Sequence, residues 1–151
     1  MKKLVEEVHK RDMYIMVDVV PNHVAPVGDQ FEKIYPFNKT EYYHKNCPIE
    51  DWSDTHQLEQ CWLHDLPDLN QDHPFVRSYL LKWIKEHTKK FKFDGLRLDA
   101  VLHIDKQFWK EFNDAAGVFC IGEIFSNIDQ LIGDYQNYLD STMNFGFVFT
   151  I

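Results

Sequence analysis

The first stretch of the chain shows a helical pattern followed by a strand pattern. In residues 1–12, Leu4, Val5 and Val8 recur on one face with charged residues opposite, which predicts the end of an amphipathic helix. Residues 14–20 then form a nearly continuous apolar run rich in β-branched side chains. Such a run is typical of a strand that is buried on both faces in a parallel sheet.

The middle stretch, residues 24–73, has no clear period of apolar and polar positions and holds many prolines and polar side chains. Because a structureless loop of this length is improbable in a compact domain, the pattern predicts a small irregular subdomain. Cys47 and Cys61 flank a short polar loop within it, where a disulfide would make sense in an oxidising compartment. Cys120 lies in an apolar run and is expected to be a buried thiol.

An alternating pattern of helices and strands resumes after this stretch. The expected elements are a helix from Pro74 to His87, a strand at 96–101, a helix capped by Asp105 and closed by Gly117, a strand at 118–124, a weaker helix at 128–139 and a strand at 143–149. Short connections between alternating elements predict an α/β fold with a parallel sheet and right-handed crossovers. Four strands fit half of a (β/α)8 barrel or a small open doubly wound sheet, and the pattern alone leaves both open.

The charge balance narrows the range of partners. The 151-residue chain has 24 acidic and 16 basic residues and a formal net charge of −8, which disfavours binding to nucleic acid or to an anionic membrane. No apolar run approaches the roughly 20 residues that span a bilayer. The segment after Met1 also lacks the apolar core of a signal peptide.

Polar side chains occur where each predicted strand ends, at Asp18, at Arg97 and Asp99, and at Glu123. The carboxyl ends of parallel strands meet at one edge, where barrel enzymes place their chemistry. Because burying an unpaired carboxylate is costly, these groups must pair, bind a metal or line a wet cavity. A salt-bridge network of Asp18, Arg97 and Asp99 is one interpretation. Two acids at equivalent heights on successive strands, Asp99 and Glu123, favour a catalytic site.

A pair of carboxylates that faces one cleft is what glycoside hydrolysis requires. One carboxylate attacks or steadies the sugar cation, and the other protonates the leaving oxygen. Other chemistries have weaker support, because the chain has no glycine-rich phosphate loop, no Gly-x-Ser-x-Gly turn and no histidines and cysteines at zinc spacings.

Four regions of the chain resemble the α-amylase family of glycoside hydrolases, in the family's order. These regions are Asp18–His23, Leu66–Asn70, Gly95–His103 and Gly122–Ile124. Between them, Cys47 and the stretches Glu59–Trp62 and Ala115–Glu123 look closest to the fungal secreted type. The resemblance implies a (β/α)8 barrel with an irregular B domain between its third strand and third helix, and it favours the barrel over the open sheet.

The resemblance also implies how the chain is divided. Residues 1–23 would form the end of helix 2 and strand 3 of the barrel, residues 24–73 the B domain, and residues 74–151 helix 3 to about strand 6. The chain would thus be an internal fragment with about half of the barrel strands.

By the same resemblance, Asp99 is the nucleophile and Glu123 the general acid/base. Arg97 would hold Asp99 ionised and oriented, which is an ordinary use of a neighbouring guanidinium. His23 would hydrogen-bond the sugar beside the cleavage point. Trp52 falls where fungal members carry a stacking tyrosine, which implies an aromatic platform for substrate.

The family's calcium ion would join the barrel to the B domain. Its implied ligands are the side-chain oxygens of Asn22 and Asp68 and the backbone carbonyls of Glu59 and His103. His103 is also implied as a substrate contact. Oxygen ligands scattered over loops suit the flexible coordination of calcium. The alternative is that Asn22 and Asp68 are turn residues.

The resemblance implies retaining hydrolysis of α-1,4-glucosidic bonds in starch- or glycogen-like glucans by a secreted parent enzyme. A related α-glucosidase or transglycosylase shares these regions, and a non-catalytic truncated product or a glucan- or calcium-binding remnant is the alternative from another class. The family's third acid follows the sixth strand and would lie outside this chain. The 151 residues alone are therefore expected not to hydrolyse starch.

Overall fold

A computed structural model describes residues 1–26 and 30–150, and its centre is a four-stranded parallel sheet. The sheet order is β1-β2-β3-β4, so each strand lies beside the next one along the chain. The strands are β1 (Met16–Val19), β2 (Gly95–Leu98), β3 (Phe119–Gly122) and β4 (Ser141–Thr142). The predicted α/β fold with a parallel sheet is confirmed.

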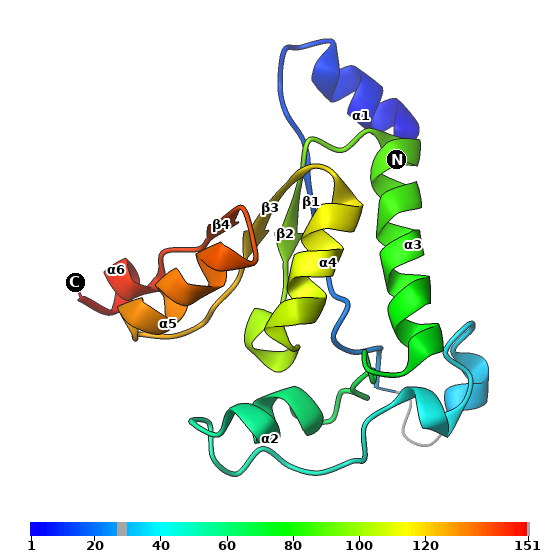
Figure 1. Cartoon of the computed structure of the whole chain (residues 1–151). Coiled ribbons are helices and arrows are strands. Elements are labelled where there is room, and N and C mark those ends of the chain that lie inside the picture. The colour runs from blue at the N-terminus through cyan, green and yellow to red at the C-terminus, as the bar shows by residue number, and fades with distance from the viewer. Residues whose placement is uncertain (27–29, 151) are drawn as a thin grey trace.

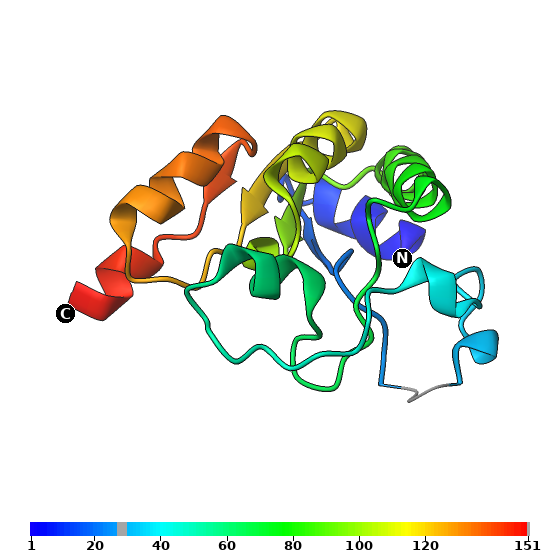
Figure 2. The same cartoon turned by 60° about the horizontal axis from the view of Figure 1, so that its bottom comes forward.

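Helices connect these strands. They are α1 (Lys2–His9), α2 (Thr55–Gln60), α3 (Pro74–Phe91), α4 (Lys106–Ala116), α5 (Asp129–Asp134) and α6 (Phe145–Thr150). Short 3-10 turns cover Phe31–Lys33, Thr40–Tyr42, Val101–His103 and Tyr135–Asn137. Figure 1 shows α3 and α4 side by side along the sheet, and Figure 2 shows α2 and the irregular stretch gathered at one end of the molecule. Within the described ranges, no helix is both long and apolar enough to cross a membrane.

The two long helices begin and end as the local sequence predicts. Pro74 occupies the first turn of α3. The carboxylate of Asp105 caps α4 by accepting hydrogen bonds from the backbone N–H groups of Gln107 and Phe108. Gly117, with φ of 64°, closes α4 in the left-handed conformation that glycine adopts at low cost.

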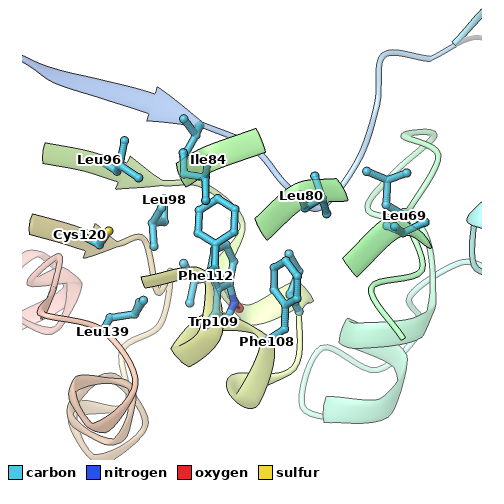
Figure 3. Packing of buried hydrophobic residues seen from close by; sticks show 14 of the residues in the cluster. Leu69, Leu80, Ile84, Leu96, Leu98, Phe108, Trp109, Phe112, Cys120 and Leu139 are labelled. Atoms are coloured by element: carbon cyan, nitrogen blue, oxygen red, sulfur yellow. Dashed lines mark hydrogen bonds between the residues drawn. The ribbon is translucent and has the colours of Figure 1, made fainter. Parts of the chain in front are cut away.

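One face of the sheet is covered by α3 and α4 (Figure 3). Leu96 and Leu98 of β2 and Cys120 of β3 are fully buried, and they pack in one cluster with Ile84 of α3 and Phe112 of α4. Apolar burial of this kind is the main favourable contribution to folding. The expectation that Cys120 is a buried thiol is confirmed.

The other face of the sheet is open in the described part of the chain. Met16 and Phe119 are 46% and 47% exposed, and Gly95 lies between them in the strand register. A Cβ atom on Gly95 would lie 3.1 Å from both the Met16 Cε and the Phe119 carbonyl oxygen, so this position favours glycine. The predicted strand at 14–20, buried on both faces, is therefore wrong in extent and burial, because the covering helices lie on one side only.

Of the two expectations at the ends of the chain, one is confirmed and one is wrong. The helix predicted within residues 1–12 is α1, which buries Val5 of its apolar face and leaves Leu4 54% exposed. Residues 143–149 were expected as a strand, but β4 ends at Thr142 and α6 follows. The reason is local, since the side-chain oxygen of Asn144 accepts a hydrogen bond from the N–H of Phe147 at 3.0 Å and so caps a helix.

The irregular stretch at 24–73, described except for residues 27–29, forms α2 and two 3-10 turns but no strand of the sheet. The predicted disulfide between Cys47 and Cys61 is present, with the two Cα atoms 4.9 Å apart. The buried aromatic side chains of the irregular stretch pack into the main core: Phe31, Phe37, Tyr42, Tyr43 and Trp62. The boundaries of a separate B domain stay a prediction.

Replacing both Cys47 and Cys61 by serine is expected to destabilise the protein. The disulfide joins residues 14 apart, and closing a loop of about 15 residues is worth about 3 kcal/mol in the chain-entropy model. Thermal unfolding followed by circular dichroism, with and without a phosphine reductant, measures the effect. The reductant should lower the midpoint of the wild-type protein and leave that of the double variant unchanged. An insensitive wild-type midpoint would contradict this account.

Candidate active site

The strand register gathers charged side chains at the carboxyl end of the sheet. Asp18 on β1 pairs in register with Arg97 on β2. The backbone N–H of Asp99 donates to a carbonyl of β1 at 3.0 Å, and that of Glu123 donates to a carbonyl of β2 at 2.9 Å. Both acids therefore continue the ladder just past the ends of β2 and β3.

One guanidinium holds these acids together. Arg97 contacts Asp18 Oδ1 at 3.0 Å through Nη1 and Glu123 Oε1 at 2.8 Å through Nη2, and its Nη1 also contacts Asp99 Oδ1. The salt-bridge network expected as one interpretation is present, and it includes Glu123. Burial tends to lower the pKa of Arg97, but the neighbouring carboxylates outweigh it and the pKa is raised.

A strained turn fixes the two acids relative to one another. Ala100, directly after Asp99, has φ of 54°, in the left-handed region that costs a residue with a Cβ about 1–2 kcal/mol. The N–H of Val101 donates to the carbonyl of Glu123 at 3.3 Å. The indole N–H of Trp109 donates to the carbonyl of Val101 at 2.9 Å, so α4 in the core holds this turn.

A cavity of about 360 Å³ opens beside both acids. Its walls include Asp99, Glu123, Trp52, His103, His64 and Phe125. Trp52 is 57% exposed, and its ring centroid lies 6.2 Å from that of His103 with the rings nearly perpendicular. The structure thus brings two of the expected substrate contacts, Trp52 and His103, into one cavity with the expected catalytic pair.

The remaining expected substrate contacts, His23 and Arg97, are not among the residues that line this cavity. Arg97 contacts two residues that do line it, Asp99 and Glu123. His23 lines a separate cavity of about 260 Å³ between β1 and α3. Burial lowers the pKa of His23, and the nearby charge of Asp99 partly offsets this effect.

The expected calcium ligands Asn22 and Asp68 lie side by side and are fully buried. Among the described residues, the Oδ1 atom of each has no hydrogen-bond partner, while Asp68 Oδ2 lies 2.5 Å from Nδ1 of His44. Burial raises the pKa of Asp68 to about 6 despite hydrogen bonds from His44 and Asn22. Buried oxygens without partners are costly, and a bound cation would remove that cost. This pair of oxygens fits a calcium ion.

The two expected carbonyl ligands belong to neighbouring segments. Nδ1 of His103 lies 3.0 Å from the carbonyl of Leu58, which places α2, with Glu59, against the turn after Asp99. Burial lowers the pKa of His103 and raises that of Glu59. Among residues 1–26 and 30–150, no three His, Cys, Asp or Glu side chains gather as a metal site. A calcium site here therefore needs the amide and backbone oxygens.

Two wall residues, Phe125 and His64, were not predicted. Phe125 is 64% exposed and follows β3 by three residues, so the rule that strand ends carry function could have found it. His64 has φ of 57°, and this conformation of a non-glycine residue has no signature in the sequence.

Comparison with known sequences identifies the family of this chain. The sequence profile of the α-amylase catalytic domain matches residues 1–151. Alpha-amylase 1 of Lipomyces kononenkoae is 36% identical over 150 residues, which are 94% of this chain and 24% of that protein. The alpha-amylase of Saccharomycopsis fibuligera is 35% identical over 153 residues, which are 96% of this chain and 31% of that protein.

Solved structures agree with the sequence matches. An α-amylase from Malbranchea cinnamomea superposes with a TM-score of 0.91 at 37% identity, covering 96% of this chain and 32% of that one. An α-amylase from Geobacillus thermoleovorans, solved with acarbose, gives 0.89 at 38% identity and covers 96% and 33%. The chain spans a quarter to a third of the length of these relatives, and its four strands are part of their (β/α)8 barrel. Since the profile covers every residue and the fold agrees, this chain belongs to the α-amylase catalytic-domain family.

Proposed function

We propose that this chain forms the part of an enzyme that carries the nucleophile and the general acid/base for retaining hydrolysis of α-1,4-glucosidic bonds in starch- or glycogen-like glucans. The observation that carries the proposal is the position of Asp99 and Glu123, which line one cavity and share one guanidinium. Retaining enzymes hold their two carboxyl groups about 5–5.5 Å apart. The contact of a single guanidinium with both carboxylates supports such a close arrangement.

The proposed reaction is a double displacement. The Asp99 carboxylate attacks the anomeric carbon, while Glu123 gives its proton to the departing glycosidic oxygen and the glucosyl–oxygen bond breaks. A water molecule then gives a proton to Glu123 and attacks the same carbon, which releases Asp99 and returns both groups to their starting states. The partly buried positions of Asp99 and Glu123, with side chains 26% and 24% exposed, favour this chemistry because they limit competition from bulk water.

Other residues of this chain would bind and orient the glucan. Trp52 offers an exposed ring on which the apolar face of a sugar can stack. His103, in the same cavity, would contact the substrate from the side. We propose that His23 hydrogen-bonds the sugar near Asp99, and that Arg97 acts through the two carboxylates rather than on the substrate.

Hydrolysis is favoured over glucosyl transfer. A cyclomaltodextrin glucanotransferase also matches, at 26% identity and a TM-score of 0.82. Its identity and TM-score are both lower than those of the α-amylases from Malbranchea cinnamomea and Geobacillus thermoleovorans. A related α-glucosidase or transglycosylase thus remains the second candidate, and a non-catalytic remnant the third.

We propose calcium as the cofactor, held by the side chains of Asn22 and Asp68 and the carbonyls of Glu59 and His103. Calcium bound there would tie the irregular stretch to the carboxyl end of β1. Secretion of the enzyme is also proposed. It is supported by the Cys47–Cys61 disulfide, which suits an oxidising compartment.

Asp99→Asn and Glu123→Gln are each expected to abolish turnover. A complete barrel is obtained by placing residues 1–151 in the matched segment of the Malbranchea cinnamomea α-amylase. Loss of the nucleophile or of the general acid should lower kcat on soluble starch by at least about 10³-fold. Asp114→Asn is the control, because this carboxylate is 63% exposed and pairs with Lys110 on the outer helix α4.

Reducing-sugar release measures turnover, and proton NMR of the first product reports the anomer. The α-anomer is expected. Near wild-type rates in both variants would exclude the assigned pair, and no turnover by the unmutated chimera would favour a non-catalytic remnant. A β-anomer would contradict retention. Transfer of glucosyl units to added maltose in place of hydrolysis would favour the second candidate.

Calcium is expected to raise the thermal unfolding midpoint of the 151-residue chain. A ligand that binds only the folded state stabilises it by about 2.7 kcal/mol at 100 times its Kd. Asn22→Ala and Asp68→Asn should remove this response. Asn113→Ala is the matched control, because the Oδ1 atom of Asn113 is also buried without a partner in the described part of the chain, but Asn113 lies in α4. Scanning calorimetry with calcium and with chelator measures the shift. A full response in the Asp68→Asn variant would refute the ligand assignment.

A further inference from the structure

We propose that His64 is a substrate-contacting residue, which binds the hydroxyl edge of the same glucosyl unit that stacks on Trp52. The inference rests on the proposed function and adds to it a residue that the family resemblance does not assign. Two independent observations support it, namely the backbone conformation of His64 and its place in the cavity wall.

The backbone conformation of His64 is unfavourable for its side chain. Non-glycine residues with positive φ in the described ranges are Asp12, His64, Lys92 and Ala100. Asp12 follows the end of α1 and Lys92 closes α3, which is a common use of the left-handed conformation. Ala100 connects β2 to the turn that holds Asp99. His64 ends no helix, so its conformation needs another explanation.

His64 lies at the second position of a four-residue turn. The N–H of Leu66 donates to the carbonyl of Leu63 at 3.2 Å and closes this turn. Turns with positive φ at the second position are dominated by glycine, asparagine and aspartate, because a larger side chain is strained there. A bulky imidazole at this position is therefore kept at a cost to stability, and strained residues of this kind concentrate at functional sites.

The position of the side chain supplies a reason for that cost. His64 is exposed and lines the cavity that also holds Asp99 and Glu123. Its ring centroid lies 6.3 Å from that of Trp52, with an angle of 49° between the planes. Within the described residues its imidazole has no hydrogen-bond partner. Both ring nitrogens are thus available to a ligand in the cavity.

The two side chains suit the two surfaces of a pyranose ring. Trp52 presents a flat apolar surface for the C–H face of the sugar. A neutral imidazole has one donor and one acceptor, which matches neighbouring hydroxyl groups on the sugar edge. Because the rings are inclined to each other, a sugar stacked on Trp52 would turn its hydroxyl edge toward His64. We therefore assign a neutral glucosyl unit as the ligand of this pair.

The test is binding of maltoheptaose to the 151-residue chain, followed by tryptophan fluorescence and by NMR shifts of the indole and imidazole protons. His64→Gly should bind about fivefold more weakly, the factor expected for one hydrogen bond. The same variant should unfold at an equal or higher temperature, because glycine relieves the strained φ. His64→Asn tolerates this conformation and keeps a donor and an acceptor, so it should retain most of the affinity.

Two controls separate the possible failures. His56→Ala removes another exposed histidine, on α2, and should change nothing. Trp52→Ala should abolish binding if the cavity is the glucan site. Unchanged affinity in His64→Gly, with binding lost in Trp52→Ala, would overturn the role of His64 and leave the proposed function intact. No binding by the wild-type chain at millimolar maltoheptaose would overturn the proposed glucan site itself.

Discussion

The contact of the Arg97 guanidinium with three carboxylates is the interaction on which this site depends. Without it, the carboxylates would repel one another at the end of the sheet, most strongly Asp99 and Glu123, whose limited exposure weakens solvent screening. The planar guanidinium offers several donors in a fixed fork, so it can bind two carboxylates in different directions at once. A lysine would supply the charge without that geometry. The parallel register makes the arrangement possible, because it sets Asp18 opposite Arg97.

The covered face of the sheet makes this arrangement rigid. Trp109 is fully buried in α4, yet its indole N–H binds the carbonyl of Val101 in the turn that follows Asp99. This hydrogen bond thus connects the packed core directly to the turn that carries Asp99. A site of this kind acts by preorganised charge, which costs little reorganisation during the reaction only if its supports do not move. The helices therefore contribute to chemistry although none of their side chains has to touch the substrate.

Structural features that neighbouring residues determine were predicted well from the sequence, and features that depend on contacts between distant parts of the chain were not. Asp105 caps the start of α4 and Gly117 closes its end. Both act through contacts within a few residues, so the sequence alone was sufficient to find them. The apolar run at 143–149 fits a strand or a helix equally well, and a single cap at Asn144 decides for the helix. The candidate pair Asp99 and Glu123 could be found because strand ends in a parallel sheet converge. The turn conformation of His64 could not be predicted from the sequence, because the surrounding fold sets its φ.

The two ends of the sheet differ in whether their polar side chains have hydrogen-bond partners. At the amino end, Oδ2 of Asp94 accepts a hydrogen bond from the N–H of Ile15 at 2.8 Å and contacts His9 at 2.9 Å, and these hydrogen bonds lower the pKa of Asp94. Near the carboxyl end, the Oδ1 atoms of Asn22 and Asp68 are buried and have no partner among the described residues, and Asn113 Oδ1 in α4 is the one other buried side-chain atom of this kind there. Such groups each cost on the order of 1–3 kcal/mol. The two unpaired oxygens near the carboxyl end therefore support the calcium ion proposed there, because a bound cation would remove their cost.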